Sequence, residues 1–399
     1  MRAALLLLAL GVATAAHAGD VVRAEVVLIR HGVRSPTKPA ETYAAYARGT
    51  WPAWSVAPGM LTAHGKDGMR AIGARWRTEL VADGALASAC PDADRVVVIG
   101  DSTPRNRESS EAFSEGLAPG CHLGYLATAG DENNALFHYR KDDDDDAPST
   151  SAQAHAALTA LQSLLLDCGA LDCASVAKKD GKKLLPEAPA EAMKLAGTLS
   201  ENLMLAYAEG LPMSAVAFGR GDRSTLERLI LLHNAQFAAG KKAMPAAARA
   251  GSNLAAHILG TLQAAAGDKP SVAPLLATGR GVVVLVGHDT NLANIAGVFG
   301  LDWHDAARPD DYSPGGALSF TLVERDGHPF VLVRQLMPSM DDLRANRYEG
   351  MKRGPVHVAG CPTMGECPLD TLVTEARKRL DANRIDNALP SMAKQASMP

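Results

Sequence analysis

Three side chains capable of binding an anion follow one apolar segment within five positions. Arg30, His31 and Arg34 stand in the stretch LIRHGVRSPT, directly after the strand-like run at residues 21–29. Arginine offers planar, paired donors that match the geometry of phosphate. A purely structural role does not explain this stretch well, and the stretch predicts an oxyanion site that contains a histidine.

Two further groups of this kind stand at the ends of apolar runs. The stretch VVVIGDSTPRNR brings Arg105, and VVVLVGHDTN brings His288 and Asp289. Ligands of α/β sheets bind outside the carboxyl ends of the strands, so we expect these groups to converge with the first on one pocket. Three arginines and two histidines would form a cage for a phosphate group there.

The residue types also predict a reaction. Neutral imidazole at His31 can attack phosphorus without a separate base, whereas a serine would need one. The departing alkoxide requires a proton, which the carboxyl group of Asp289 can donate. The resulting carboxylate can then activate the water that attacks the phosphohistidine. A carboxyl group donates a proton only if its surroundings or an acidic medium keep it protonated, so we expect activity weighted toward acid pH.

Composition narrows the class of protein and its partners. A chain of 399 residues with 47% hydrophobic content can bury a substantial core, and two domains are expected. The net charge of −4 argues against a generally basic surface and therefore against a nucleic-acid partner. The expected partner is a small phosphomonoester. We expect a monomer, although no sequence feature requires one.

The first 18 residues are predicted to be a signal peptide. They combine a basic Arg2, an apolar run and the small-residue pattern Ala16-His17-Ala18 before Gly19. The apolar run is shorter than the ~20 residues of a membrane-spanning helix, and no later segment qualifies. The mature protein is expected to be periplasmic or secreted, with no membrane partner.

Six cysteines agree with export, because disulfides persist in oxidising compartments. A zinc site is the alternative, but no CxxC motif and no close grouping of cysteine with histidine supports one. Six cysteines allow many connectivities. Proximity along the chain suggests the pairs Cys90 with Cys121, Cys168 with Cys173, and Cys361 with Cys367.

The order of apolar patterns predicts an interrupted α/β domain. Strand-like runs alternate with helical segments such as residues 65–82, and a strand pair is expected across the turn at Asp326-Gly327. Helical spacing dominates the middle of the chain. We therefore predict an α/β catalytic domain at residues 19–139 and 268–399, and an inserted α-helical domain at residues 140–267. The run KDDDDDAPST at residues 141–150 is interpreted as a solvated linker.

With these motifs, the sequence resembles the histidine acid phosphatases, and within them the bacterial periplasmic phytases and glucose-1-phosphatases. The segments RHGVRSP and GHDTN match the family's two motifs, and RESSEAFSEGLAPGC, LLHNAQF, PGGALSF and GCPTMGECPLD also look like family segments. The resemblance implies a mixed central sheet flanked by helices, like that of phosphoglycerate mutase, and no metal or organic cofactor. It implies roles for six residues: His31 as nucleophile, Arg30, Arg34 and Arg105 as phosphate ligands, His288 as a phosphate contact, and Asp289 as proton donor.

The resemblance leaves the substrate open. Thr37 and Lys38 follow the first motif as a Thr-Lys pair does in bacterial phytases, and an ammonium group there suits the additional phosphates of phytate. Glu201 aligns with an acidic pocket residue of the phytases. The stretch GLPMSAVAFG, however, is more similar to glucose-1-phosphatases. We expect a phytase, with a glucose-1-phosphatase or a broad acid phosphatase as the alternative.

Two other classes of protein, a binding protein without activity and a serine hydrolase, are less favoured. An exported protein that only binds a phosphorylated ligand would be expected to lack the nucleophile or the acid, and this sequence has both. The stretch GDS at residues 100–102 follows a strand, as in some serine hydrolases. No DxxH partner for such a serine is found downstream.

Overall fold

The computed structural model describes residues 19–92, 94–130, 132–138 and 152–395. The predicted signal peptide at residues 1–18 and the aspartate-rich linker at residues 141–150 lie outside these residues. Within them, no helix is long and apolar enough to cross a membrane.

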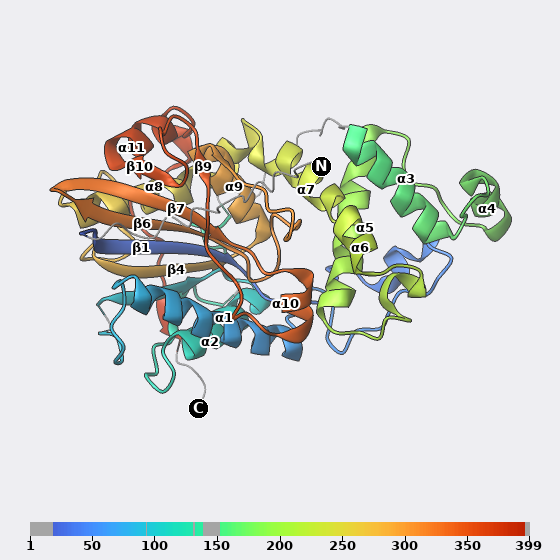
Figure 1. Cartoon of the computed structure of the whole chain (residues 1–399), viewed down its shortest axis with the longest axis horizontal. Coiled ribbons are helices and arrows are strands. Elements are labelled where there is room, and N and C mark those ends of the chain that lie inside the picture. The colour runs from blue at the N-terminus through green and yellow to red at the C-terminus, as the bar shows by residue number, and fades with distance from the viewer. Residues whose placement is uncertain (1–18, 93, 131, 139–151, 396–399) are drawn as a thin grey trace, which may run out of the picture.

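A mixed sheet forms the centre of the molecule (Figure 1), and it has the order β10-β7-β6-β1-β4-β2-β3-β11, with β8 paired to β7. Parallel pairing joins β1 to β4, β4 to β2 and β2 to β3, whereas β6 and β7 run antiparallel to their neighbours. The expected α/β fold with a mixed sheet is confirmed. The strands are β1 (Val21–Arg30), β2 (Val96–Gly100), β3 (Tyr125–Ala127), β4 (Gly281–Gly287), β6 (Ala317–Arg325), β7 (His328–Leu336), β8 (Gly354–Pro355), β10 (Glu366–Pro368) and β11 (Ala393–Gln395), with β5 (Leu301–Asp302) and β9 (His357–Val358) paired separately.

Helices cover both faces of this sheet, which explains why its central strands are apolar on both sides. Along β1, Val27 and Ile29 face one core, whereas Val26 and Leu28 face the other. Figure 1 shows α1 and α2 on the first face and α8, α9 and α11 on the second. These helices are α1 (Ala63–Ala82), α2 (Pro104–Leu117), α8 (Ala246–Ala266), α9 (Asp289–Phe299) and α11 (Leu369–Arg377).

A second group of helices lies beside one end of the sheet (Figure 1) and surrounds the long buried helix α5. The helix α10 (Met340–Ala345) packs against α5 from the α/β part. The group consists of α3 (Ala152–Leu166), α4 (Cys173–Asp180), α5 (Pro189–Ala208), α6 (Arg223–Leu229) and α7 (Leu231–Phe237). Short helical turns complete the chain at η1 (Ala40–Thr42), η2 (Ala44–Tyr46), η3 (Val216–Gly219), η4 (Ala238–Lys242) and η5 (Ala382–Arg384).

The predicted division of the chain at residues 140 and 267 stays a prediction. The helix α8 lies inside the predicted insertion, yet its buried residues Leu254, Ile258 and Leu262 pack in the core that lies on the sheet. An amphipathic helix pattern does not specify which neighbour covers its apolar face. We therefore propose that the helical insertion ends before α8.

Local predictions of turns and disulfides agree with the structure. Asp326 and Gly327 join β6 to β7, and both have positive φ, which a two-residue hairpin turn of this type requires. All six cysteines form disulfides, with Cα–Cα distances of 5.5, 5.2 and 5.2 Å. The pairs are Cys90–Cys121, Cys168–Cys173 and Cys361–Cys367, as predicted.

Candidate active site

Three strands of the sheet end side by side, and the residues just beyond them form the site. In the strand register, Arg30 lies opposite Gly287 and Gly100 lies opposite Val286. His31, His288 and Asp101 therefore follow the ends of adjacent parallel strands. The predicted convergence of the three motifs is what the strand order produces, because parallel strands present their carboxyl ends at one edge.

Close packing against α1 holds the loop after β1. A Cβ atom on Gly32 would lie 2.7 Å from the carbonyl oxygen of Gly65, and one on Gly65 would lie 2.0 Å from the carbonyl oxygen of Val33. Only glycine fits at these two positions without movement of the backbone. The Gly32 amide also donates to Ser109 Oγ at 3.2 Å. The loop is therefore fixed from two sides.

His31 is held in the tautomer that a nucleophile needs. Its Nδ1 atom lies 2.9 Å from the carbonyl oxygen of Gly32, which can only accept a hydrogen bond. Nδ1 therefore carries the proton, and Nε2 keeps its lone pair. Burial of His31, followed by the charges of Arg105 and Arg30, lowers its pKa well below the ordinary value. The site therefore favours the neutral imidazole.

Glu201 on α5 joins two of the predicted phosphate ligands. Its carboxylate accepts hydrogen bonds from Arg30 Nη2 and, at 3.0 and 3.1 Å, from Arg34 Nη2. Burial acts to raise the pKa of Glu201, but Arg34 and Arg30 outweigh it and lower the pKa. The sequence predicted a pocket residue that contacts substrate. The structure places it against the two arginines, where it fixes their orientation and offsets part of their charge.

Arg105 is placed differently from the other two arginines. Its Nη2 atom lies 3.2 Å from His288 Nδ1, and no carboxylate of the described residues forms an ion pair with it. Since a guanidinium only donates, Nδ1 of His288 accepts and Nε2 carries the proton. Burial, followed by the charge of Arg34, lowers the pKa of Arg105 to about 10. Asp289 and Asp101 offset these effects only in part, so Arg105 supplies positive charge that no direct ion pair neutralises.

Asp289 begins α9 and lies at the edge of the cage. Its Oδ2 atom is 2.9 Å from Arg30 Nη2 and 3.9 Å from His233 Nε2. Burial acts to raise the pKa of Asp289, but Arg30, His233 and Arg34 outweigh it, and the pKa lies below its ordinary range. The free site therefore holds Asp289 as a carboxylate. The expectation that its surroundings could keep the proton in place does not apply to the free site.

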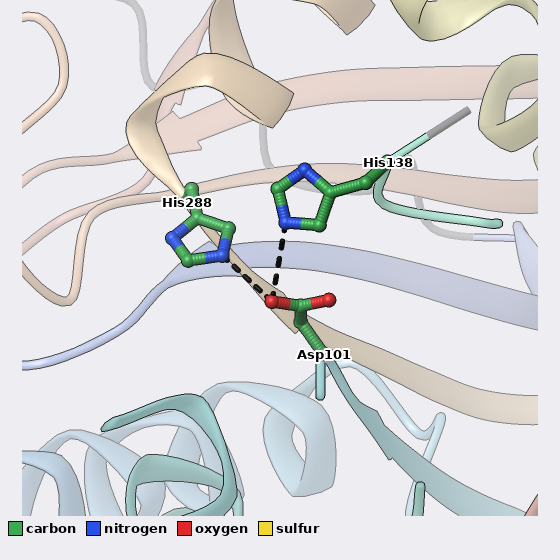
Figure 2. A group of neighbouring side chains, drawn as sticks. All are labelled: Asp101, His138 and His288. Atoms are coloured by element: carbon green, nitrogen blue, oxygen red, sulfur yellow. Dashed lines mark hydrogen bonds and ion pairs between the residues drawn. The ribbon is translucent and has the colours of Figure 1, made fainter. Parts of the chain in front are cut away.

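Figure 2 shows how Asp101 connects two histidines. Its Oδ2 atom is 2.8 Å from His288 Nε2 and 3.3 Å from His138 Nε2. Burial acts to raise the pKa of Asp101, but the hydrogen bonds from both histidines outweigh it, and the pKa is lowered. Asp101 remains ionised and fixes the ring of His288.

Sequence reasoning missed Asp101, His138 and His233 as members of the site. Asp101 follows β2 as His31 follows β1, so its position relative to a strand end was an available signal. His138 reaches Asp101 from a loop, and His233 reaches Asp289 from α7. His233 stands in LLHNAQF, one of the family-like segments, but no local pattern reveals either contact, because each joins segments that are distant in the chain.

The predicted substrate residues Thr37 and Lys38 are both exposed. Lys38 lines a cavity of about 190 Å³ whose wall also includes Ser35, the neighbour of Arg34, and Asn202, the neighbour of Glu201. Its apolar wall includes Tyr43, Trp51 and Trp54. Neither His31 nor the three arginines line this cavity, which is linked to the cage through Ser35 and Asn202. A group attached to a caged phosphate could extend into it.

Known proteins resemble this chain in sequence and in architecture. The family model described as "Histidine phosphatase superfamily (branch 2)" matches residues 21–194. The chain is 30% identical to Phytase AppA of Escherichia coli strain K12, over 88% of this chain and 91% of that protein. It is 26% identical to the glucose-1-phosphatase of Salmonella typhimurium strain LT2, over 86% and 89% of the two chains. Among solved structures, the Hafnia alvei phytase in complex with myo-inositol hexakis sulphate matches with a TM-score of 0.78 and 28% identity, covering 92% of this chain and 99% of that one.

Proposed function

This chain belongs to the histidine phosphatase superfamily (branch 2) and hydrolyses phosphomonoesters, and we propose that it is an exported phytase that works through a phosphohistidine. The observation that carries the mechanism is the buried, neutral His31, whose Nε2 lone pair is free among three arginines. The predicted leader and the three disulfides support export.

In the proposed first step, Nε2 of His31 attacks phosphorus and the bond from phosphorus to the ester oxygen breaks. Arg30, Arg34 and Arg105 stabilise the charge that develops on the other phosphate oxygens. Asp289 gives its proton to the departing alkoxide. In the second step, the Asp289 carboxylate takes a proton from water as that water attacks the phosphohistidine, which releases phosphate and restores His31.

The proton on Asp289 has to be gained with the substrate, because the free site favours the carboxylate. A bound phosphate faces the same arginines and places negative charge beside Asp289. The contact with the arginines and the added negative charge both weaken the effect of Arg30, and both therefore raise the pKa of Asp289. A phosphomonoester monoanion, present in acidic solution, can bring the proton into the site. This supports activity weighted toward acid pH.

Lys38 and the cavity beside it support a substrate larger than a simple ester. The exposed ammonium of Lys38 can meet a second phosphate of phytate while the first occupies the cage. The aromatic wall formed by Tyr43, Trp51 and Trp54 favours a second candidate. Such a wall also suits the ring of a hexose, so glucose 1-phosphate is the alternative substrate.

Steady-state kinetics on the mature chain tests the proposal. We expect kcat/KM for phytate to exceed that for glucose 1-phosphate by at least about tenfold, because only phytate presents further phosphates to Lys38. The reverse order would favour the second candidate. A failure to hydrolyse phytate, glucose 1-phosphate and p-nitrophenyl phosphate would contradict the proposed function.

A further inference from the structure

Asp101, His138 and His288, here named the Asp101 cluster, have the composition of a transition-metal site. One ligand atom from each residue lies within 4.8 Å of the others. Figure 2 shows both rings directed at the same carboxylate oxygen. Imidazole and carboxylate are ligands that zinc and copper ions accept readily.

The hydrogen bonds within the cluster are poorly matched. Asn106 Nδ2 lies 3.2 Å from Asp101 Oδ2 and 3.0 Å from His288 Nε2. Since His288 Nε2 donates to Asp101, two donors face each other across that 3.0 Å contact. Asn106 is fully buried, and its Oδ1 atom has no hydrogen-bond partner among the described residues. A buried, unpartnered amide oxygen needs an explanation, and an ion bound among the three converging groups would provide one.

We propose that the Asp101 cluster binds one divalent transition-metal ion, with Zn²⁺ as the representative ion. Ligand atoms around a tetrahedral zinc ion are roughly 3.3 Å apart, as follows from bonds of about 2.0 to 2.1 Å. The existing distances of 2.8 and 3.3 Å to Asp101 Oδ2 need only a small expansion. A rotation of the Asn106 amide group would bring its unpartnered oxygen toward the ion as a fourth donor.

Access and selectivity favour this cluster over the other candidate among the described residues. The His138 side chain is 39% exposed, so an ion can enter from solvent, whereas Asp101 and His288 are buried. The alternative group of Glu201, His233 and Asp289 already holds the guanidinium of Arg30 between its carboxylates. No thiol competes for the ion, because all six cysteines are in disulfides.

Occupancy of the cluster would inhibit the enzyme. An ion on Nε2 of His288 shifts the ring proton to Nδ1, which now accepts from Arg105 Nη2 at 3.2 Å. Two donors would then oppose each other, and Arg105 would have to move out of its position in the cage. This inhibitory consequence rests on the proposed function, whereas binding of the ion does not.

Calorimetric titration of the tag-free mature chain with Zn²⁺ in phosphate-free buffer tests the binding. We expect one ion per chain, and His138→Gln should weaken its affinity by at least about 100-fold, since loss of an outer partner alone can cost 10- to 100-fold. The matched control is His357→Gln, which removes an exposed histidine on β9, far from the cluster in the chain, and should leave the affinity unchanged. Co²⁺ in place of Zn²⁺ should give the visible absorption of a tetrahedral site in wild type but not in His138→Gln.

Activity measurements separate the binding from its consequence. Zn²⁺ should inhibit hydrolysis of p-nitrophenyl phosphate by wild type and by His357→Gln, and should inhibit His138→Gln only at about 100-fold higher concentration. Lack of binding by wild type, or equal loss of affinity in both histidine variants, would overturn the metal site. Binding that depends on His138 without inhibition would keep the site and refute the role assigned to Arg105.

Discussion

Replacement of Arg105 should have opposite effects on activity and stability. Burial, followed by the charge of Arg34, lowers the pKa of Arg105 from its ordinary value to about 10. At about 1.4 kcal/mol for each pKa unit, this lowering corresponds to about 3 to 4 kcal/mol of unfavourable free energy for the charged side chain in the free site. A bound phosphate relieves that cost. The same free energy that destabilises the empty site is thus available to stabilise the transition state.

We expect Arg105→Gln to lower kcat/KM for p-nitrophenyl phosphate by about 10²- to 10³-fold, the usual effect of removing one preorganised donor. Inhibition by inorganic phosphate should weaken by a similar factor. The midpoint of thermal unfolding should rise, because the variant no longer buries a charge that Asp289 and Asp101 offset only in part. Steady-state kinetics and differential scanning calorimetry measure the two effects on the same preparation.

Arg107 provides the matched control from the same helix. Its guanidinium donates to the backbone carbonyls of Ser102, Thr128 and Gly130 at 2.9, 2.6 and 2.6 Å. Arg107→Gln should therefore lower the unfolding midpoint and change kcat/KM by less than about tenfold. The reasoning is refuted if Arg105→Gln lowers the unfolding midpoint and leaves kcat/KM within about tenfold of wild type.

Three further predictions concern the acid, the substrate and stability. Asp289→Asn should slow phytate hydrolysis by about 10²- to 10⁴-fold, because an amide cannot protonate the alkoxide; equal losses with p-nitrophenyl phosphate, whose leaving group needs no proton, would contradict the acid role. Lys38→Ala should raise KM for phytate far more than for p-nitrophenyl phosphate, and equal changes would remove Lys38 from the specificity residues. Burial, followed by Asp310, raises the pKa of Asp311 to about 7, so the folded state loses stability as pH rises from about 4 to about 7. Asp311→Asn should therefore raise the unfolding midpoint at pH 8 and change it little at pH 4, and a rise of equal size at both would refute this explanation.

The arrangement of the cage could be predicted from sequence because it depends on local patterns. Apolar runs mark the strands that end at Arg30, Gly100 and Gly287, and parallel pairing places the residues after them at one edge. The hairpin at Asp326-Gly327 follows from turn chemistry alone. These features need no knowledge of distant packing.

The remaining features depend on contacts between segments that are distant in the chain. Helical periodicity identifies α8 as amphipathic, but not that the sheet covers its apolar face. The resemblance to phytases identified Glu201 as a pocket residue, but it could not reveal that Arg30 and Arg34 bind the Glu201 carboxylate. The charge state of Asp289 likewise depends on Arg30, which lies on another strand end 2.9 Å away. Such effects are set by tertiary packing and not by the local pattern.

The covalent role of His31 is the central claim, and rapid-quench labelling tests it most directly. Wild-type enzyme mixed with a radiolabelled phosphomonoester and quenched within one turnover should carry acid-labile, base-stable phosphate on the peptide that contains His31. His31→Ala should show no label and no turnover, although Arg30, Arg34 and Arg105 should still bind inorganic phosphate. Substantial turnover by His31→Ala, or label on a different residue in wild type, would contradict the account.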